Sequence, residues 1–132
     1  MKKIVNIGII GFGTVGEGVY RLIQSNSDTI ASRSGITLKV KTICDLKTPD
    51  IKNVNPETTL TDRWCDVTGD SEIDIVIEVI GGISPAREII IDALHKGKNV
   101  VTANKKLLAE EGASILEAII ETGNSLGFEA AV

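Results

Sequence analysis

Three glycines near the start of the chain have the spacing of a phosphate-binding turn. Gly11, Gly13 and Gly16 form the pattern G-x-G-x-x-G, between an aliphatic run that ends at Ile10 and a segment of helical character. In a strand–turn–helix unit the first glycine permits a sharp turn, the second lets a phosphate approach, and the third lets the helix pack closely. The free N–H groups of the helix N-terminus then face the anion. The pattern predicts a site for the diphosphate of a dinucleotide.

A carboxylate lies where the ribose of such a ligand would be held. Asp45 follows the predicted second strand, at a distance from Gly16 that exceeds the usual ~20 residues. We attribute the added length to a loop over residues 26–35. A carboxylate in this place binds ribose hydroxyls and repels a 2′-phosphate, which favours NAD over NADP. An aspartate that caps a turn is an equally good interpretation, and the nearby Lys41 and Lys47 leave NADP open.

Two lysines could act on a substrate beside the dinucleotide. Lys105 and Lys106 open a predicted helix over residues 104–122, where a cation opposes the helix dipole by a few tenths to ~1 kcal/mol. Lys105 directly follows a predicted strand over residues 98–102, at the same edge of the sheet as the glycine turn. It is therefore a candidate to bind an oxygen or carboxylate of the substrate. Lys106 is interpreted as a solvated surface lysine.

A glycine pair follows another predicted strand. Ile80, Gly81 and Gly82 end a predicted strand over residues 73–80, at the carboxyl edge where open α/β sheets bind ligands. Backbone there can lie against a nicotinamide ribose, although an ordinary turn before the next helix would need no ligand.

Two glutamates stand in otherwise apolar strands. A buried carboxylate must be paired, protonated or bound to a cation. We expect Glu129 to serve a neighbouring domain or a metal, and Glu78 to mark the end of its strand.

Strand and helix patterns alternate along the whole chain, which predicts an α/β fold with a doubly wound parallel sheet, a Rossmann-type dinucleotide-binding domain over residues 1–132. Ile and Val dominate the apolar residues and only 3% are aromatic, as is typical of strands covered on both faces. The predicted strands cover residues 3–10, 36–44, 73–80, 98–102 and 125–132, and the predicted helices cover residues 14–25, 85–96 and 104–122. The last strand ends without a polar tail, so we expect a longer protein whose substrate and dimerisation domain is absent from this chain.

Composition excludes several classes of partner. The net charge of -4 has no basic cluster to offset it, which argues against nucleic acid. Charged residues interrupt every apolar run, so no membrane span is expected. Cys44 and Cys65 lack metal-ligand spacing and are interpreted as reduced thiols, and the N-terminus does not resemble a signal peptide. These features favour a cytoplasmic protein.

Four blocks of the sequence resemble the homoserine dehydrogenase family: residues 11–16, 75–82, 101–109 and 128–132. The T-A-N-K and F-E-A-A-V blocks, in this order, are far more specific than the glycine pattern. The resemblance implies the reversible conversion of L-homoserine to L-aspartate 4-semialdehyde with NAD(P), in threonine, methionine and isoleucine synthesis. It also implies a homo-oligomer when the protein is full length.

The resemblance also implies roles for particular residues. Lys105 corresponds to the family's lysine between coenzyme and substrate, which takes part in catalysis. The residues that correspond to the coenzyme site are Phe12, Gly13, Thr14 and Val15 in the glycine turn, with Ile80 and Gly81 beside the nicotinamide ribose. Glu129 and the Val132 carbonyl correspond to the start of a monovalent-cation site.

The chain departs from the family's pattern in two respects. The substrate-binding acids and a second catalytic lysine would lie downstream of its last residue, so the fragment alone is expected to be inactive. Asp45 stands where many relatives have an arginine, which again favours NAD. Two other functions stay open on sequence alone: a non-catalytic module that senses dinucleotides, and a dehydrogenase of another small substrate.

Overall fold

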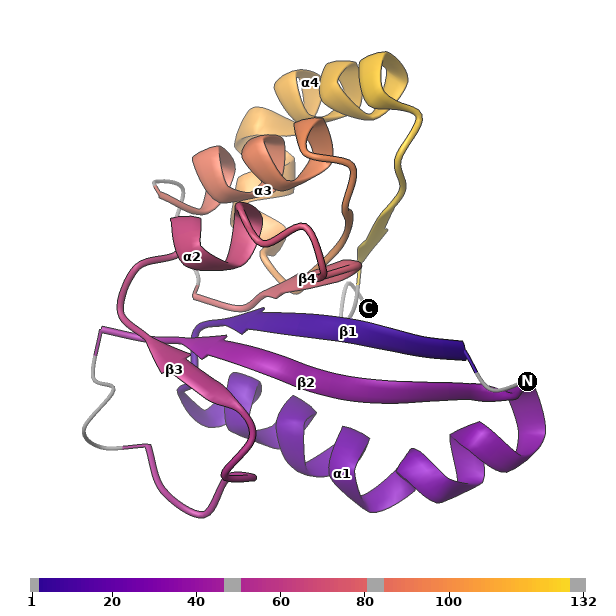
Figure 1. The fold of residues 1–132 in the computed structure, drawn as a ribbon. Helices are drawn as coiled ribbons and strands as arrows, with labels where there is room; N and C mark the ends of the chain where they lie inside the picture. Colours follow the sequence, from indigo (N-terminus) through magenta and orange to yellow (C-terminus); the bar gives the residue numbers. More distant parts are fainter. Residues whose placement is uncertain (1–2, 47–50, 81–84, 129–132) are drawn as a thin grey trace.

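A computed structural model of the chain describes residues 3–46, 51–80 and 85–128, and within them an all-parallel six-stranded sheet in the order β3-β2-β1-β4-β5-β6 (Figure 1). The strands are β1 (Lys3–Ile10), β2 (Ile36–Cys44), β3 (Thr59–Thr61), β4 (Ile75–Glu78), β5 (Asn99–Thr102) and β6 (Leu126–Phe128). The helices are α1 (Thr14–Ser34), α2 (Cys65–Thr68), α3 (Ala86–His95) and α4 (Lys105–Thr122). This order reverses between β1 and β4, and it confirms the predicted doubly wound fold.

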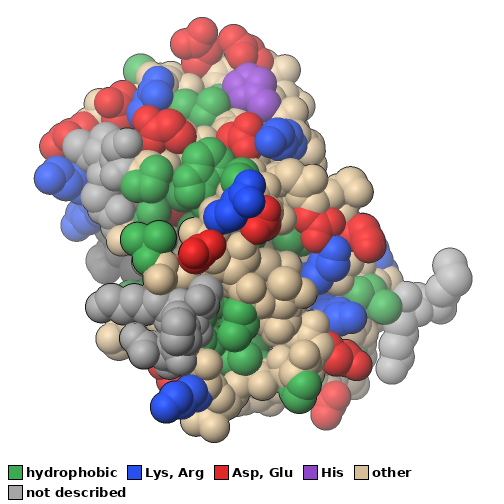
Figure 2. Space-filling model, turned by 60° about the vertical axis from the view of Figure 1, so that its left-hand side comes forward, with side chains coloured by type: hydrophobic (Ala, Val, Ile, Leu, Met, Phe, Trp, Pro, Cys, Tyr) green, Lys and Arg blue, Asp and Glu red, His purple; other side chains and the backbone are tan. Residues whose placement is uncertain are grey.

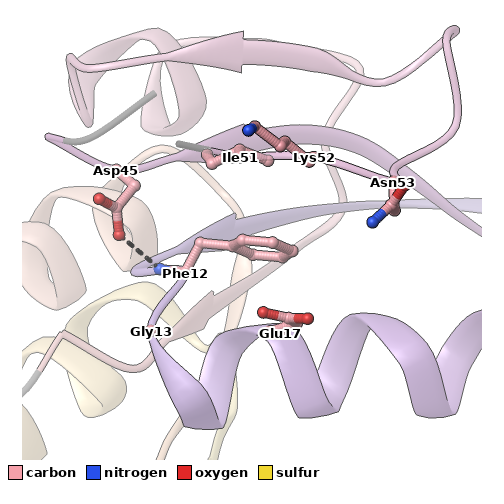
Figure 3. Close-up of a pocket in the computed structure, with 7 residues that line it drawn as sticks. All are labelled: Phe12, Gly13, Glu17, Asp45, Ile51, Lys52 and Asn53. Carbon is pink, nitrogen blue, oxygen red and sulfur yellow. Dashed lines mark hydrogen bonds between the residues drawn. The ribbon is translucent and has the colours of Figure 1, made fainter. Parts of the chain in front are cut away.

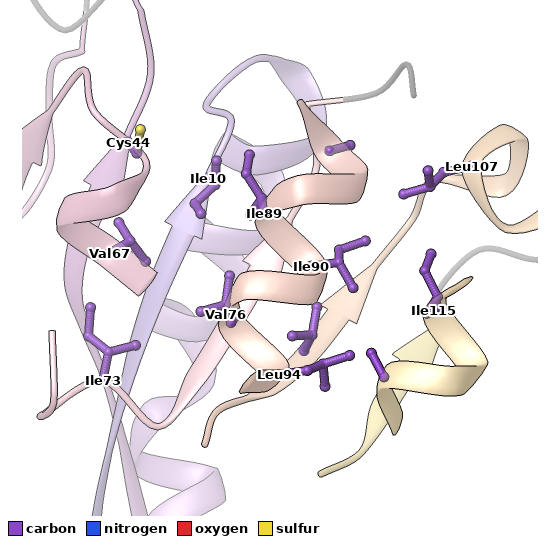
Figure 4. Packing of buried hydrophobic residues seen from close by; sticks show 14 residues of the cluster. Ile10, Cys44, Val67, Ile73, Val76, Ile89, Ile90, Leu94, Leu107 and Ile115 are labelled. Carbon is purple, nitrogen blue, oxygen red and sulfur yellow. The ribbon is translucent and has the colours of Figure 1, made fainter. Parts of the chain in front are cut away.

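Helices cover both faces of the sheet. Helix α1 lies on one face, where Tyr20 and Ile23 pack with Ile9 and Ile43 of the strands. Helices α2, α3 and α4 lie on the other face and form a second aliphatic core (Figure 4). The strands are therefore buried on both sides, which explains why they consist of continuous aliphatic runs.

Helix α3 shows how the sequence pattern specifies packing. Its buried residues recur at helical spacing: Ala86, Ile89, Ile90, Ala93 and Leu94. This stripe contacts the sheet and α4, as the spacing predicts. Pro85 immediately precedes the helix at its N-cap position.

The expected loop over residues 26–35 is wrong, because α1 continues through this segment to Ser34. Gly35 ends the helix in the left-handed conformation (φ +74°), and its N–H donates to the Ala31 carbonyl. The segment is polar because most of its residues face solvent, and a few positions such as Ile30 are partly buried. The additional residues between Gly16 and Asp45 therefore belong to a longer helix α1 and not to a loop.

Residues 58–69, which the sequence leaves ambiguous, form the edge strand β3 and the single turn α2. The strand expected over residues 73–80 is shorter, since β4 ends at Glu78. Strand β6 confirms the start of the last predicted strand, and residues 129–132 lie outside the described part. Within that part, none of the helices has the length and apolar character needed to span a bilayer.

His95 links the ends of α3 and α4, and it gives a pH-dependent prediction. The Ile91 carbonyl and then the Glu121 carboxylate hold the pKa of His95 above its usual value. A raised pKa stabilises the fold at pH values below the unfolded pKa, and the contribution disappears as the pH rises through the folded pKa. We therefore expect His95→Gln to lower the midpoint of thermal unfolding at about pH 5 and to have no effect at about pH 9. An equal effect at both pH values would exclude this role.

Candidate functional site

The glycine turn has the backbone geometry that the sequence predicts. Gly11 adopts φ +104°, and an added Cβ would lie 2.9 Å from the backbone nitrogen of Ile80. A Cβ on Gly16 would lie 1.9 Å from the Gly11 carbonyl oxygen, so α1 can approach the strand only without a side chain here. Gly13 is exposed and occupies the N-cap position of α1, where no side chain bonds the free N–H groups. A Cβ added to Gly13 would meet nothing within 4 Å. The N-terminus of α1 therefore faces open space.

Asp45 lies directly against this turn. Its Oδ2 accepts a hydrogen bond of 2.7 Å from the Phe12 N–H, which Figure 3 shows as a dashed line. Two backbone bonds fix the approach: Gly11 donates to the Cys44 carbonyl at 2.8 Å, and Asp45 donates to the Thr61 carbonyl at 2.9 Å. The carboxylate thus bonds a loop 33 residues away in the chain. An aspartate that only caps a turn would bond residues close to it in the sequence, so this alternative does not account for the hydrogen bond to Phe12.

Two pockets meet at Asp45 and Gly13. The first pocket, of about 460 Å³, lies between the start of α1 and residues 51–53 (Figure 3). It is lined by charged and polar groups, among them Glu17 and Lys52, together with the Phe12 ring. A ribose or phosphate that projects past Asp45 would enter this pocket.

The second pocket, of about 500 Å³, lies on the α2 and α3 side of the sheet and is mostly apolar. Trp64, Ile80 and Ile89 line it, and its size and character suit a flat heteroaromatic ring. Cys44 also lines it, and burial followed by the charge of Asp45 raises the pKa of that thiol to about 12. The thiol is therefore protonated at neutral pH and serves as a wall of the pocket.

Helix α1 holds the far wall of the first pocket through residues that the sequence analysis missed. The Tyr20 hydroxyl is buried and accepts a 2.7 Å hydrogen bond from the Asn55 N–H, while Phe12 packs edge-on against its ring. Arg21 lies over the same ring and donates to the Asn53 carbonyl. The one available signal is that Tyr20 is the only tyrosine of the chain and lies one turn after the glycine pattern.

The ends of β4 and β5 carry the remaining candidates. Glu78 is the last residue of β4, as expected, and its fully buried carboxylate is hydrogen bonded to Thr102 and to the Ile80 N–H. Ile80 is 39% exposed at the carboxyl edge of the sheet. Lys105 and Lys106 are exposed at the start of α4, and within the described residues no hydrogen bond or ion pair engages either side chain. The glycine turn, Ile80 and Lys105 all follow C-terminal ends of neighbouring strands.

Figure 2 turns this carboxyl edge forward, and it shows acidic and basic side chains interspersed around exposed apolar groups. Gly81, Glu129 and Val132 lie outside the described residues, so the structure does not place the nicotinamide-side glycine or the predicted cation ligands. Among residues 3–46, 51–80 and 85–128, His, Cys, Asp and Glu side chains form no group that could hold a metal ion.

Comparison with known proteins gives one consistent result. Residues 11–129 match the family model described as the NAD-binding domain of homoserine dehydrogenase. The chain is 37% identical over 131 residues to the homoserine dehydrogenase of Bacillus subtilis, and 41% identical over 130 residues to that of Pseudomonas aeruginosa. Each alignment covers 98% of this chain and 30% of the relative. The chain therefore spans about 30% of the length of these relatives.

Solved structures agree with the sequence relatives. The crystal structure of Staphylococcus aureus homoserine dehydrogenase at pH 7.5 superposes with a TM-score of 0.92 at 34% identity, over 100% of this chain and 33% of that one. The Thiobacillus denitrificans enzyme gives 0.91 at 39% identity, over 99% of this chain and 30% of that one. A hyperthermophilic archaeal homoserine dehydrogenase in complex with NADPH shares the fold, with a TM-score of 0.76 at 24% identity.

Proposed function

This chain belongs to the homoserine dehydrogenase family as its NAD-binding domain, and we propose that the whole protein interconverts L-homoserine and L-aspartate 4-semialdehyde with a nicotinamide dinucleotide. The substrate and dimerisation parts would then lie in the rest of a homo-oligomeric protein. One observation carries the role of this domain: the Phe12–Asp45 hydrogen bond places a carboxylate against an open glycine turn, between a polar and an apolar pocket. A sensing module is disfavoured, because the matched relatives are enzymes.

The residues present fit a dinucleotide. The open space at Gly13 and the N-terminus of α1 would receive the diphosphate, with Gly11, Phe12, Thr14, Val15 and Gly16 forming the rest of the turn. Asp45 would hold the adenosine ribose, and the apolar pocket would hold adenine. Ile80 and Gly81 would then lie beside the nicotinamide ribose, toward Lys105.

The bound coenzyme would supply a hydride acceptor or donor. On reduction of the semialdehyde the Lys105 side chain would give a proton to the carbonyl oxygen, and on oxidation of homoserine it would accept the hydroxyl proton as the hydride leaves for the coenzyme. Its place at the first residue of α4, next to the end of β5, supports this role. We also propose that Glu129 and the Val132 carbonyl belong to a monovalent-cation site, and that the enzyme works in the cytoplasm, consistent with its free cysteines.

The direct test is an assay of the full-length protein with L-homoserine and each nicotinamide coenzyme. We expect reduction of coenzyme that depends on homoserine, with NAD⁺ used more efficiently than NADP⁺. Reduction driven by a different hydroxy acid, with none from homoserine, would assign the domain to a dehydrogenase of another substrate. Coenzyme binding without turnover of any hydroxy acid would favour the sensing module.

Asp45 gives the prediction on coenzyme choice. Replacing it with Ala or Asn removes the charge that would repel a 2′-phosphate, so the ratio of kcat/KM for NAD⁺ to that for NADP⁺ should fall roughly tenfold or more. Asn is the informative variant, because its side-chain oxygen still accepts the Phe12 N–H. If Asp45→Asn changes the ratio and Asp45→Ala also lowers affinity for both coenzymes, the charge sets the preference and the hydrogen bond holds the turn. An unchanged ratio in both variants would refute this role.

A further inference from the structure

We propose that Glu78 is a positioning residue, which fixes the nicotinamide side of the site and the N-terminus of α4 relative to each other. The proposal rests on the proposed function, because it acts through Lys105 and the backbone at Ile80. Glu78 itself is buried beneath the carboxyl edge, at 0% exposure, and its carboxylate accepts hydrogen bonds from the Ile80 N–H and the Thr102 hydroxyl.

The carboxylate joins two strand ends through one donor on each side. Its Oε2 accepts a 2.9 Å hydrogen bond from the Ile80 N–H, and its Oε1 accepts a 2.6 Å hydrogen bond from the Thr102 hydroxyl. The Thr102 Oγ1 in turn accepts the Asn104 N–H at 3.0 Å. Asn104 caps α4, with its side-chain oxygen bonded to the Leu107 N–H. A continuous series of hydrogen bonds therefore runs from Ile80 to the first turn of the helix that carries the proposed catalytic lysine.

The chemistry of this series suits a carboxylate at position 78. Both groups that face Glu78 are donors, a backbone N–H and a hydroxyl, and a carboxylate offers only acceptors. Since the single hydroxyl proton of Thr102 is directed to Glu78, its lone pairs are left for the Asn104 N–H. Glutamine has the same shape but would direct its NH₂ group at one of these donors, so one of the two links would break. A buried carboxylate is unfavourable unless it is hydrogen bonded. Here its two hydrogen bonds hold the ends of β4 and β5 in a fixed orientation.

Val79 and Ile80, which directly follow Glu78, also contact the glycine turn. The Val79 N–H donates to the Ile10 carbonyl at 2.9 Å, and the backbone at Ile80 closes against Gly11, where an added Cβ would lie within 2.9 Å. A shift at the end of β4 would therefore move the backbone beside the nicotinamide ribose, whereas Asp45 and the polar pocket lie on the far side of β1. Val79 and Ile80 also line one side of the apolar pocket, but neither lines the polar pocket, so the adenosine side should respond to Glu78 much less than the nicotinamide side.

The experiment compares three variants in a full-length homoserine dehydrogenase that carries this domain. Glu78→Gln and Thr102→Val each break the link with little change of volume, and Thr102→Ser keeps the hydroxyl. Thr58→Val is the matched control, because Thr58 is also buried and its hydroxyl also donates one hydrogen bond, of 2.9 Å, to the Val40 carbonyl. The readouts are kcat, KM for each substrate, the inhibition constant of 5′-AMP as a probe of the adenosine side, and the midpoint of thermal unfolding.

We expect Glu78→Gln and Thr102→Val to lower kcat about ten- to hundredfold, since small displacements of reacting groups have effects of this order. The inhibition constant of 5′-AMP should change far less, by about twofold at most, because 5′-AMP lacks the second ribose and the nicotinamide. Thr102→Ser should recover most of the lost turnover, and Thr58→Val should lower the unfolding midpoint without a comparable loss of kcat.

Wild-type turnover of homoserine separates the two hypotheses, because its absence contradicts the proposed function before any variant is compared. Given wild-type turnover, a folded Thr102→Val enzyme with normal kcat would overturn the role of Glu78, even where Glu78→Gln fails to fold. A loss of kcat in Thr58→Val as large as that in Thr102→Val would also overturn it, since the effect would then follow stability alone.

Discussion

Replacing Gly16 with alanine is expected to destabilise the domain by about 3 kcal/mol and to abolish coenzyme binding. The new Cβ would lie 1.9 Å from the Gly11 carbonyl oxygen and 3.3 Å from the Val79 side chain. The clashing atoms at Gly11 are backbone atoms, so no rotamer change of a side chain can relieve the overlap. Helix α1 must move away from the strand, and its N–H groups then leave the position that would face the diphosphate.

The measurements are chemical denaturation and titration with NADH, followed by fluorescence. Gly18→Ala is the matched control, because Gly18 lies in the same helix and an added Cβ there meets nothing within 4 Å. That variant should bind NADH normally and gain about 0.5–1 kcal/mol of stability, the usual difference between Ala and Gly in a helix. Normal NADH affinity in Gly16→Ala would show that close packing of α1 does not govern the site.

The glycine turn could be predicted because its geometry is local. The three glycines, the preceding aliphatic run and the start of the following helix are consecutive in the sequence, and steric exclusion at Gly11 and Gly16 allows few other arrangements. The doubly wound parallel sheet could be predicted for a related reason, since alternating strands and helices with right-handed crossovers leave few topologies. Asp45 lies against this turn because it directly follows β2, the strand that pairs with β1, and its role toward a ribose stays a prediction.

The extent of α1 and the wall held by Tyr20 could not be predicted from the residues. The polar stretch after Ser25 resembles a loop because an exposed helix and a loop have the same composition, and only Gly35 marks the true end. The bonds from Tyr20 and Arg21 join α1 to residues 53 and 55, more than thirty residues away. Such contacts depend on how the chain folds back, and no local spacing encodes them.

Glu78 illustrates the same limit at a single residue. Its position at a strand end was predicted, because the apolar run around it is visible in the sequence. Its partners were not, since Thr102 lies 24 residues later and reaches Glu78 only through the pairing of β4 with β5. The sequence shows which carboxylates need a partner, and the register of the sheet decides which partner they receive.

Replacing Lys105 with alanine should lower kcat of the full-length enzyme by about 10²- to 10⁴-fold, the usual contribution of a positioned proton donor or acceptor. The fold should be unaffected, because the side chain is exposed and removing a cation from the first turn of α4 relieves an unfavourable interaction with the helix dipole. The measurements are steady-state turnover with homoserine and the midpoint of thermal unfolding.

Lys106→Ala is the control that gives this experiment its meaning. Lys106 is also exposed and lies in the same helical turn, so both variants remove the same charge from the same end of α4. A general electrostatic effect on the coenzyme or on the helix would therefore appear in both variants, whereas proton transfer at the substrate oxygen would be lost only with Lys105. Near-normal kcat in Lys105→Ala, or equal losses in the two variants, would remove Lys105 from the mechanism. Lys105→Arg separates charge from proton transfer, because arginine keeps the cation but stays protonated at neutral pH.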